Sequence, residues 1–218
     1  MILVKFEFDN LRQDAVELWH EAFGDSEEYI NFFHGVHASC VCLMQTEHDE
    51  LASALYLIDG ELCDRQGYYL LAAATFKKFR GQGHMASLLR KAEAFAKQNG
   101  KSFVALVPAE SSLFDYYSRF GYKTAFYAKK QPIAEKIPDA ENRFAWCSEH
   151  TDYIICEHEK YGTDILNHNG DIYCVFDSEY IKVPAPKSEA YRYGMILPLD
   201  EGADKLTQLD SYIGLTME

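Results

Sequence analysis

Apolar residues follow two different periods along the chain, and these periods divide the first 130 residues into helices and strands. Apolar positions three and four residues apart predict helices over 11–23 and 84–98, because this spacing places them on one helical face. Runs rich in β-branched and aromatic residues predict strands over 2–8, 68–76 and 101–107. The run YYLLAAATF at 68–76 is apolar throughout, which is typical of a central strand buried on both faces.

Shorter segments fill the gaps between these elements. Asp25 and Ser26 can cap a second helix, which carries glutamates in its first turn. Residues 40–62 predict two strands joined by a polar turn at 48–50. A short helix over 110–120 and a strand over 122–128 complete this part, with Gly121 between them.

The remainder of the chain has a weaker pattern. Residues 129–142 hold two prolines and mostly polar residues, which is typical of a linker. Beyond it we expect a helix over 148–161, a strand pair around a turn at 168–170, and a strand over 191–199. The sequence therefore predicts a domain at 1–130 and an α+β extension at 131–218.

Composition narrows the class of protein. A chain of 218 residues that is 48 % hydrophobic and 14 % aromatic can bury a core, which excludes a disordered chain. No apolar run approaches the roughly 18 residues that a membrane span needs, and the first residues do not resemble a signal peptide. Six cysteines are too few for a disulfide scaffold. We expect a cytoplasmic protein with free thiols and no membrane contact.

Charge is distributed unevenly. The net charge of −13 argues against nucleic acid as a partner, because affinity for phosphate backbones depends on cations. Residues 1–64 hold 2 cations and 14 acids, whereas residues 65–130 hold 12 cations and 3 acids, a net charge of +9. This basic middle predicts an anionic ligand. The competing interpretation is chance clustering on solvated faces.

The strongest chemical signal is a turn with glycines at 81 and 83, between the strand over 68–76 and the helix over 84–98. The first amides of a helix lack intrahelical partners, and the helix dipole adds positive potential there. Glycines let a ligand approach the main chain without interference from a Cβ atom. Fixed positive charge beside the turn comes from Lys77, Lys78 and Arg80. The turn therefore suits a phosphate or pyrophosphate.

Two nucleotide motifs compete for this turn. A P-loop needs Lys-Ser/Thr after its last glycine, but His84 and Met85 follow Gly83. The G-x-G-x-x-G/A string of dinucleotide-binding proteins is satisfied from Gly81 to Ala86, although five residues separate it from the strand. An NAD(P)-dependent oxidoreductase is therefore a distant alternative.

The pattern K-x-x-G-x-G-x-x-A at 78–86 resembles the pyrophosphate motif of the GNAT acyltransferase superfamily. The segment from Phe114 to Tyr122 is similar to the helix-to-strand segment that follows it in that family. The resemblance covers about residues 1–130. It implies an α+β (mixed α/β) fold with a central mixed, splayed β-sheet flanked by helices.

The resemblance also implies acetyl-CoA as co-substrate, held where the strands over 68–76 and 101–107 splay apart. Main-chain groups of the first strand would pair with the pantetheine arm, and the amides of the turn would hold the pyrophosphate. The residues assigned to the cofactor in this way are Ala73, Ala74, Thr75, Lys78, Arg80, Gly81, Gln82, Gly83, His84, Met85 and Ala86. No metal is expected.

By the same resemblance, Tyr117 is the general acid that protonates the leaving sulfur. The competing interpretation is a core tyrosine in an aromatic-rich helix. The two splayed strands carry no acid or histidine, so Glu110 is the candidate for steering a water that deprotonates the amine. A helix-capping role for Glu110 is the alternative.

Acceptor choice is expected in the first 64 residues, whose negative charge favours a cationic acceptor such as a polyamine, an aminoglycoside or a lysine side chain. A solvated acidic face explains the same charge. The sequence therefore predicts an N-acetyltransferase that acts by direct transfer to a primary amine of a small molecule or a protein. The alternative is a CoA-binding sensor or structural module without catalytic activity, which the missing base supports.

Overall fold

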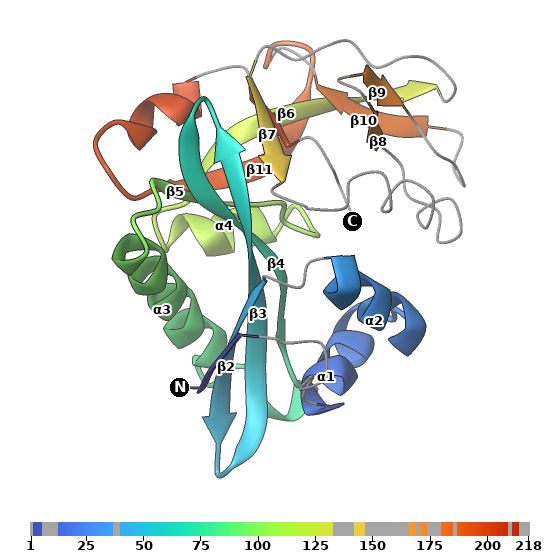
Figure 1. The fold of residues 1–218 in the computed structure, drawn as a ribbon, viewed down its shortest axis with the longest axis vertical. Coiled ribbons are helices and arrows are strands. Elements are labelled where there is room, and N and C mark those ends of the chain that lie inside the picture. Colours follow the sequence, from blue (N-terminus) through green and yellow to red (C-terminus); the bar gives the residue numbers. More distant parts are fainter. Residues whose placement is uncertain are drawn as a thin grey trace.

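The computed structural model describes residues 2–5, 13–36, 40–132, 142–146, 166–168, 171–173, 180–184, 187–208 and 211–213. Within these parts, ten strands form one mixed sheet in the order β1-β2-β3-β4-β5-β11-β6-β12-β7, with β10 paired to β6 (Figure 1). Helices flank both faces of this sheet. No helix among the described residues is long and apolar enough to cross a membrane.

The sheet strands are β1 (Ile2–Lys5), β2 (Val41–Glu47), β3 (Glu50–Leu62), β4 (Arg65–Thr75), β5 (Phe103–Leu106), β6 (Lys123–Pro132), β7 (Asn142–Trp146), β10 (Tyr180–Pro184), β11 (Tyr191–Pro198) and β12 (Ser211–Ile213). The helices are α1 (Gln13–Phe23), α2 (Glu27–Val36), α3 (His84–Gln98) and α4 (Leu113–Ser118), with 3₁₀ turns η2 (Lys77–Phe79) and η3 (Ala203–Gln208). A separate hairpin joins β8 (Leu166–His168) and β9 (Asp171–Tyr173). These elements confirm the helices, strands and hairpin that the sequence predicts within the described residues.

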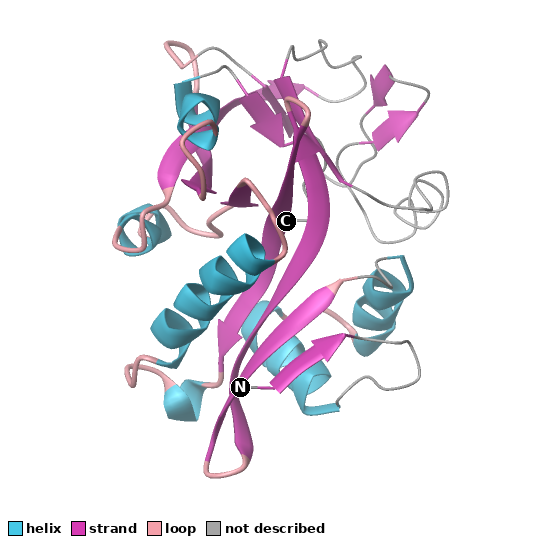
Figure 2. Ribbon diagram, turned by 60° about the vertical axis from the view of Figure 1, so that its left-hand side comes forward, coloured by secondary structure: helices cyan, strands magenta, loops and turns pink. Residues whose placement is uncertain are grey.

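Two hydrophobic clusters fill the two faces of the sheet. Because side chains alternate along a strand, Tyr56 and Ile58 of β3 belong to the cluster that includes α1 and α2. Leu55 and Leu57 belong instead to the cluster that includes α3 and α4. Figures 1 and 2 show these helix pairs on opposite sides of the long β3–β4 hairpin. The central strands are thus buried on both faces, as the apolar run in β4 predicts.

Strands β4 and β5 separate after a short stretch of pairing. They run parallel and pair only from Gly67–Phe103 to Tyr69–Ala105, although β4 continues to Thr75. The end of β4 stays attached to β3, where the hydroxyls of Ser53 and Thr75 lie 2.7 Å apart. From Leu70 onward, the β5-facing edge of β4 has no partner strand among the described residues.

The extension contributes a strand to the middle of this sheet. Strand β11 lies between β5 and β6 and is antiparallel to both, with Ile196 opposite Ala105 on one side and Lys123 on the other. The sheet therefore runs across the boundary predicted at residue 130. The division into 1–130 and 131–218 stays a prediction about folding units.

One expectation about the linker is wrong. Residues 129–132 continue β6 as a strand, because that end of β6 pairs antiparallel with β10, from Ala128–Pro184 to Pro132–Tyr180. Tertiary pairing overrides the polar, proline-containing composition there, and Pro132 sits at the last residue of the strand. The helix predicted over 148–161 lies outside the described residues.

Candidate functional site

A β-bulge marks the open part of β4. Two residues, Ala72 and Ala73, stand opposite Leu55 of β3, between the pairs Ala54–Ala74 and Tyr56–Leu71. Ala72 has a φ of 46°, in the left-handed region that non-glycine residues seldom adopt. Bulges redirect a strand and end regular pairing. The stretch predicted to pair with pantetheine, Ala73 to Thr75, begins within this bulge.

The glycine turn connects β4 to α3. Gly81 and Gly83 have φ values of 77° and 85°, and a Cβ atom added to either would meet nothing within 4 Å. These glycines are therefore required by backbone conformation and leave open space outside the turn. Gly83 is the N-cap of α3, and no side chain caps this helix end. Its first amides are available to an anion.

Acidic side chains of the β2–β3 hairpin already contact the turn. Lys78 forms an ion pair with Glu50, which lowers the pKa of that carboxyl through the hydrogen bond and charge of the ammonium. The Nε2 atom of His84 lies 4.0 Å from the carboxylate of Glu47. A phosphate at this turn would therefore share its cations with two carboxylates of the protein.

Arg80 extends across the turn in a different way. Its Nε donates to the carbonyl of Thr75 at 3.1 Å, which links the end of β4 to the glycine turn. Gln82 bridges back to the carbonyl of Lys78 at 3.4 Å. Among the described residues, no carboxylate lies within ion-pair distance of the Arg80 guanidinium, so its charge remains available to a ligand.

Internal ion pairs account for part of the basic middle. Five of its cations have acidic partners: Arg65 with Asp200, Lys78 with Glu50, Lys97 with Glu93, Lys101 with Asp59 and Lys123 with Asp204. For these five, an acidic side chain within the fold compensates the charge, and the cofactor-binding role of Lys78 stays a prediction. Three guanidiniums have no such partner within the described structure, those of Arg80, Arg90 and Arg119.

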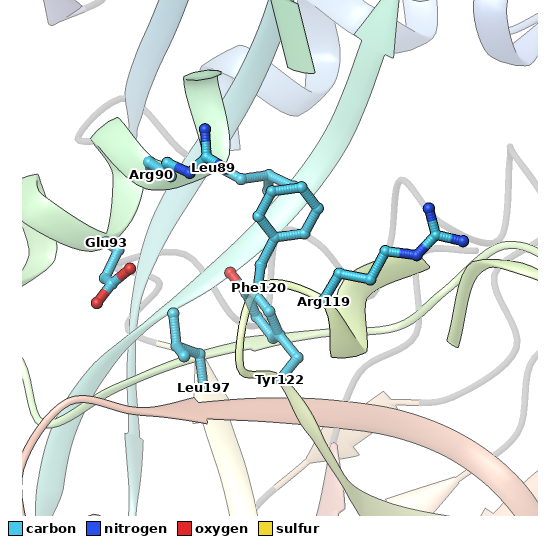
Figure 3. A pocket seen from close by; sticks show the side chains of 7 residues that line it. All are labelled: Leu89, Arg90, Glu93, Arg119, Phe120, Tyr122 and Leu197. Carbon is cyan, nitrogen blue, oxygen red and sulfur yellow. The ribbon is translucent and has the colours of Figure 1, made fainter. Parts of the chain in front are cut away.

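Two of these arginines line a pocket of about 260 Å³ between α3 and the end of α4, and the guanidinium of Arg119 points away from Arg90 and Glu93 (Figure 3). Its walls are Leu89, Arg90, Glu93, Arg119, Phe120, Tyr122 and Leu197. The guanidinium of Arg90 lies 5.8 Å from the centre of the Phe120 ring. Glu93 is already engaged by Lys97 at 2.7 Å.

The Tyr122 side chain lies in the wall of this pocket with its hydroxyl buried. It is 3 % exposed, and its hydroxyl has no hydrogen-bond partner within the described part of the chain. Burial raises the pKa of Tyr122 well above its ordinary value, so the hydroxyl stays protonated. The pocket therefore offers a ligand the Phe120 ring and the guanidinium of Arg90, with the carboxylate of Glu93 in its wall.

Tyr117 lies on the inner face of α4. It is 8 % exposed and packs against Tyr116 and Tyr122, with ring centres 5.5 and 5.6 Å away. This packing is compatible with a core residue. It is equally compatible with a general acid, because it keeps water from the hydroxyl that would donate the proton. Its role as general acid stays a prediction.

Glu110 lies in the turn that begins α4. Its carbonyl accepts from the amide of Leu113 at 3.0 Å, and its carboxylate accepts from the hydroxyl of Ser112 at 3.3 Å. The side chain is exposed. Among the described residues the carboxylate accepts from no amide of α4, whose N-cap is Ser112, so the structure does not show the capping role. The water-steering role stays a prediction.

A second pocket, of about 400 Å³, opens at the carboxyl end of β5. It is lined by Val107, Pro108, Ala109, Glu110, Ser111, Phe114, Tyr191, Arg192 and Tyr193. Sequence reasoning missed the last three residues as site residues. No local signal identifies them, because they reach the pocket only through the insertion of β11 beside β5.

Other predicted features lie elsewhere. Helices α1 and α2, which carry the acidic residues predicted to select the acceptor, lie on the opposite face of the sheet from α3. Glu21 of α1 accepts a hydrogen bond from the amide of Lys77 at 2.9 Å.

Cys40 and Cys42 are buried in the core, and burial raises the pKa of Cys40 to about 12. No group of three or more metal-ligating side chains gathers among the residues described.

Comparison with known proteins identifies the family. The acetyltransferase (GNAT) domain model matches residues 9–125, more than half of the chain. No curated protein matches the sequence. The chain therefore belongs to the GNAT family of acetyltransferases, which are acetyl-CoA-dependent enzymes. The family and the enzyme class that the two motifs predict are confirmed.

Solved structures share the fold at low identity. A GCN5-related N-acetyltransferase from Kribbella flavida is 15 % identical over 91 % of this chain and 72 % of its own, with a TM-score of 0.58. A Bacillus subtilis acetyltransferase in complex with CoA is 14 % identical over 91 % and 98 %, with a TM-score of 0.50. A probable N-acyltransferase from Enterococcus faecalis is 14 % identical over 64 % of this chain, with a TM-score of 0.51, and the match spans 38 % of its length. The predicted fold class is confirmed.

Proposed function

We propose that this protein transfers an acetyl group from acetyl-CoA directly to a primary amine, on a small molecule or on a protein. The observation that carries the proposal is the continuity of two features. Beyond Tyr69, the β5-facing edge of β4 has no partner strand among the described residues, and the end of this bulged strand leads through Arg80 into the uncapped glycine turn of α3. An extended amide chain and a pyrophosphate are the ligands that suit these two features in that order.

The pantetheine arm would add to β4 as a strand along Ala73 to Thr75, opposite to β3. The pyrophosphate would accept hydrogen bonds from the amides between Gly81 and Ala86, with Arg80 beside it. Lys78 would then either share its charge with Glu50 or release that carboxylate.

The pocket between α3 and α4 suits the nucleotide end of the same ligand. Arg90 is seven residues beyond Gly83, or about 10 Å along the helix axis. A ligand bound at both places would therefore extend along two turns of α3. Phe120 offers a stacking face for adenine, and the guanidinium of Arg90 beside it suits the 3′-phosphate.

When bound, acetyl-CoA supplies the thioester carbonyl that a neutral amine attacks. In this scheme the new C–N bond forms as the C–S bond breaks, and Tyr117 donates a proton to the departing sulfur. A water oriented by Glu110 carries the surplus amine proton to solvent, from which Tyr117 is reprotonated. No covalent bond to the protein is needed.

The non-catalytic alternative has one observation in its favour. The open stretch of β4 and the whole of β5 carry no acid or histidine that could serve as a base. A protein that binds CoA without turning it over would have the same cofactor site, so binding alone does not separate the two functions.

The test combines calorimetry with a turnover assay. We expect micromolar binding of acetyl-CoA, weaker binding of 3′-dephospho-CoA, and none of NADH. Release of the CoA thiol is then followed with a panel of primary amines. Absence of acetyl-CoA binding would overturn the cofactor assignment, and binding without turnover of any amine would support the sensor.

A further inference from the structure

The pocket at the end of β5 contains two opposite charges from distant parts of the chain. Glu110 comes from the turn before α4, and Arg192 comes from β11 in the extension. No ion pair joins the two side chains in the described structure, although they line the same pocket of about 400 Å³. Each charge is thus available to a ligand.

Arg192 is held in place without being neutralised. Its guanidinium carbon lies 4.7 Å from the centre of the Phe114 ring, a cation–π contact with a side chain that is 4 % exposed. Its main chain pairs with Tyr127 of β6. No carboxylate among the described residues lies within ion-pair distance of it. A positioned guanidinium of this kind is suited to binding a carboxylate by two parallel hydrogen bonds.

Glu110 provides the complementary group. Its carboxylate has one polar contact among the described residues, the 3.3 Å hydrogen bond from Ser112, and its side chain is exposed. Such a carboxylate can accept hydrogen bonds from an ammonium group. The pocket therefore suits a ligand that carries a cationic and an anionic group on a small frame.

This pocket is adjacent to the predicted site of chemistry. Phe114 lines it, and Tyr117 is three residues further along α4, where residues at this spacing lie on the same helical face. Phe114, in the wall of the pocket, is consequently about one helical turn from Tyr117.

We infer that the acceptor is zwitterionic: a small primary amine that also carries a carboxylate, as an amino acid does. Arg192 binds the carboxylate and Glu110 lies toward the amine. The inference rests on the proposed acetyltransferase function and specifies its substrate class. It differs from the polyamine or aminoglycoside that the acidic amino-terminal segment favours, because such polycations would leave Arg192 without a partner.

Matched acceptor pairs test this inference, because lysine and cadaverine, or ornithine and putrescine, differ only by the carboxylate. With saturating acetyl-CoA we expect kcat/KM to favour the amino acid by at least about tenfold, the value of one charged hydrogen-bonded contact. Arg192→Gln should bring the ratio close to one and leave acetyl-CoA affinity unchanged. Lys187→Gln is the control, because it removes an exposed cation of the same extension that contacts Tyr127 and not the pocket.

The outcomes separate the two proposals. Turnover with equal or better use of cadaverine would overturn the zwitterionic acceptor and leave the acetyltransferase function standing. Absence of acetyl-CoA binding would overturn the proposed function. In that case thermal-shift measurements with lysine and cadaverine, on wild type and Arg192→Gln, still decide the inference: stabilisation by lysine that needs Arg192 supports it, and equal shifts refute it.

Discussion

Replacing Gly83 with glutamate should separate the effect of charge at the glycine turn from the effect of backbone strain. The φ of 85° places residue 83 in the left-handed region, where a side chain costs about 1–2 kcal/mol. Space is not limiting, because an added Cβ meets nothing within 4 Å. The strain therefore lowers the free energy of unfolding, and it does so equally for Gly83→Glu and Gly83→Gln.

Only the glutamate should have a large effect on cofactor affinity. A carboxylate about 6 Å from one phosphate charge is repelled by about 3 kcal/mol at an effective dielectric constant of about 20. This repulsion corresponds to about a hundredfold weaker binding of acetyl-CoA. Gly83→Gln has the same shape and the same strain without the charge, so its Kd should stay within a few-fold of wild type.

Calorimetric titration of both variants with acetyl-CoA checks this prediction, and thermal unfolding checks that both are folded. The difference between the variants should shrink when the salt concentration is raised from 0.1 to 1 M, because the screening length falls from about 10 to about 3 Å. Equal affinities for the Glu and Gln variants would refute the placement of a pyrophosphate at this turn.

Three further predictions concern the chemistry and the core. Tyr117→Phe should retain acetyl-CoA binding but lower turnover about 10²-fold if the hydroxyl is the general acid. In thiol-release assays, a rate within about twofold of wild type would show instead that Tyr117 is a core residue. Burial among aromatic rings lowers the pKa of His34 to about 4, so between about pH 6.5 and 4 the unfolded chain binds a proton that the folded protein does not. The free energy of unfolding should therefore fall as the pH drops through this range. Denaturant titrations at several pH values would contradict this if the free energy of unfolding of His34→Gln had the same pH dependence as that of wild type. Gly67→Ala should destabilise the protein by about 1–3 kcal/mol, because its Cβ would lie 2.4 Å from the Phe103 ring. Adding Phe103→Leu should relieve much of this cost, and additive losses of stability in urea unfolding would contradict the explanation.

Local signals in the sequence were sufficient to predict α3 and the glycine turn before it. The helix predicted over 84–98 is α3 with the same bounds, because its apolar period, the glycines before it and Asn99–Gly100 after it are all short-range features. The sequence predicted Gly81 and Gly83 as a place for close ligand approach, and only the structure shows that both adopt left-handed conformations. The apolar run of β4 likewise predicted a strand buried on both faces, although not its bulge at Ala72.

The net charge of a sequence segment did not predict which of its cations are available to a ligand. Lys78 contributes to the basic excess of its segment, yet the fold brings Glu50 of a neighbouring hairpin against it. Lys101 and Lys123 have their acidic partners 42 residues earlier and 81 residues later in the chain. Segment totals cannot distinguish a cation that binds a ligand from one that is paired within the fold, because pairing depends on neighbours in space.

The acceptor half of the site depends on tertiary structure alone. Arg192 reaches the turn that holds Glu110 because β11 inserts between β5 and β6, and the pattern of β11 specifies a strand without specifying its partners. Strand pairing joins residues that are distant in the chain, and its register decides which side chains line a pocket. The sequence therefore determined the elements and the glycine turn, whereas the packing of the sheet decided which side chains meet in the pocket at the end of β5.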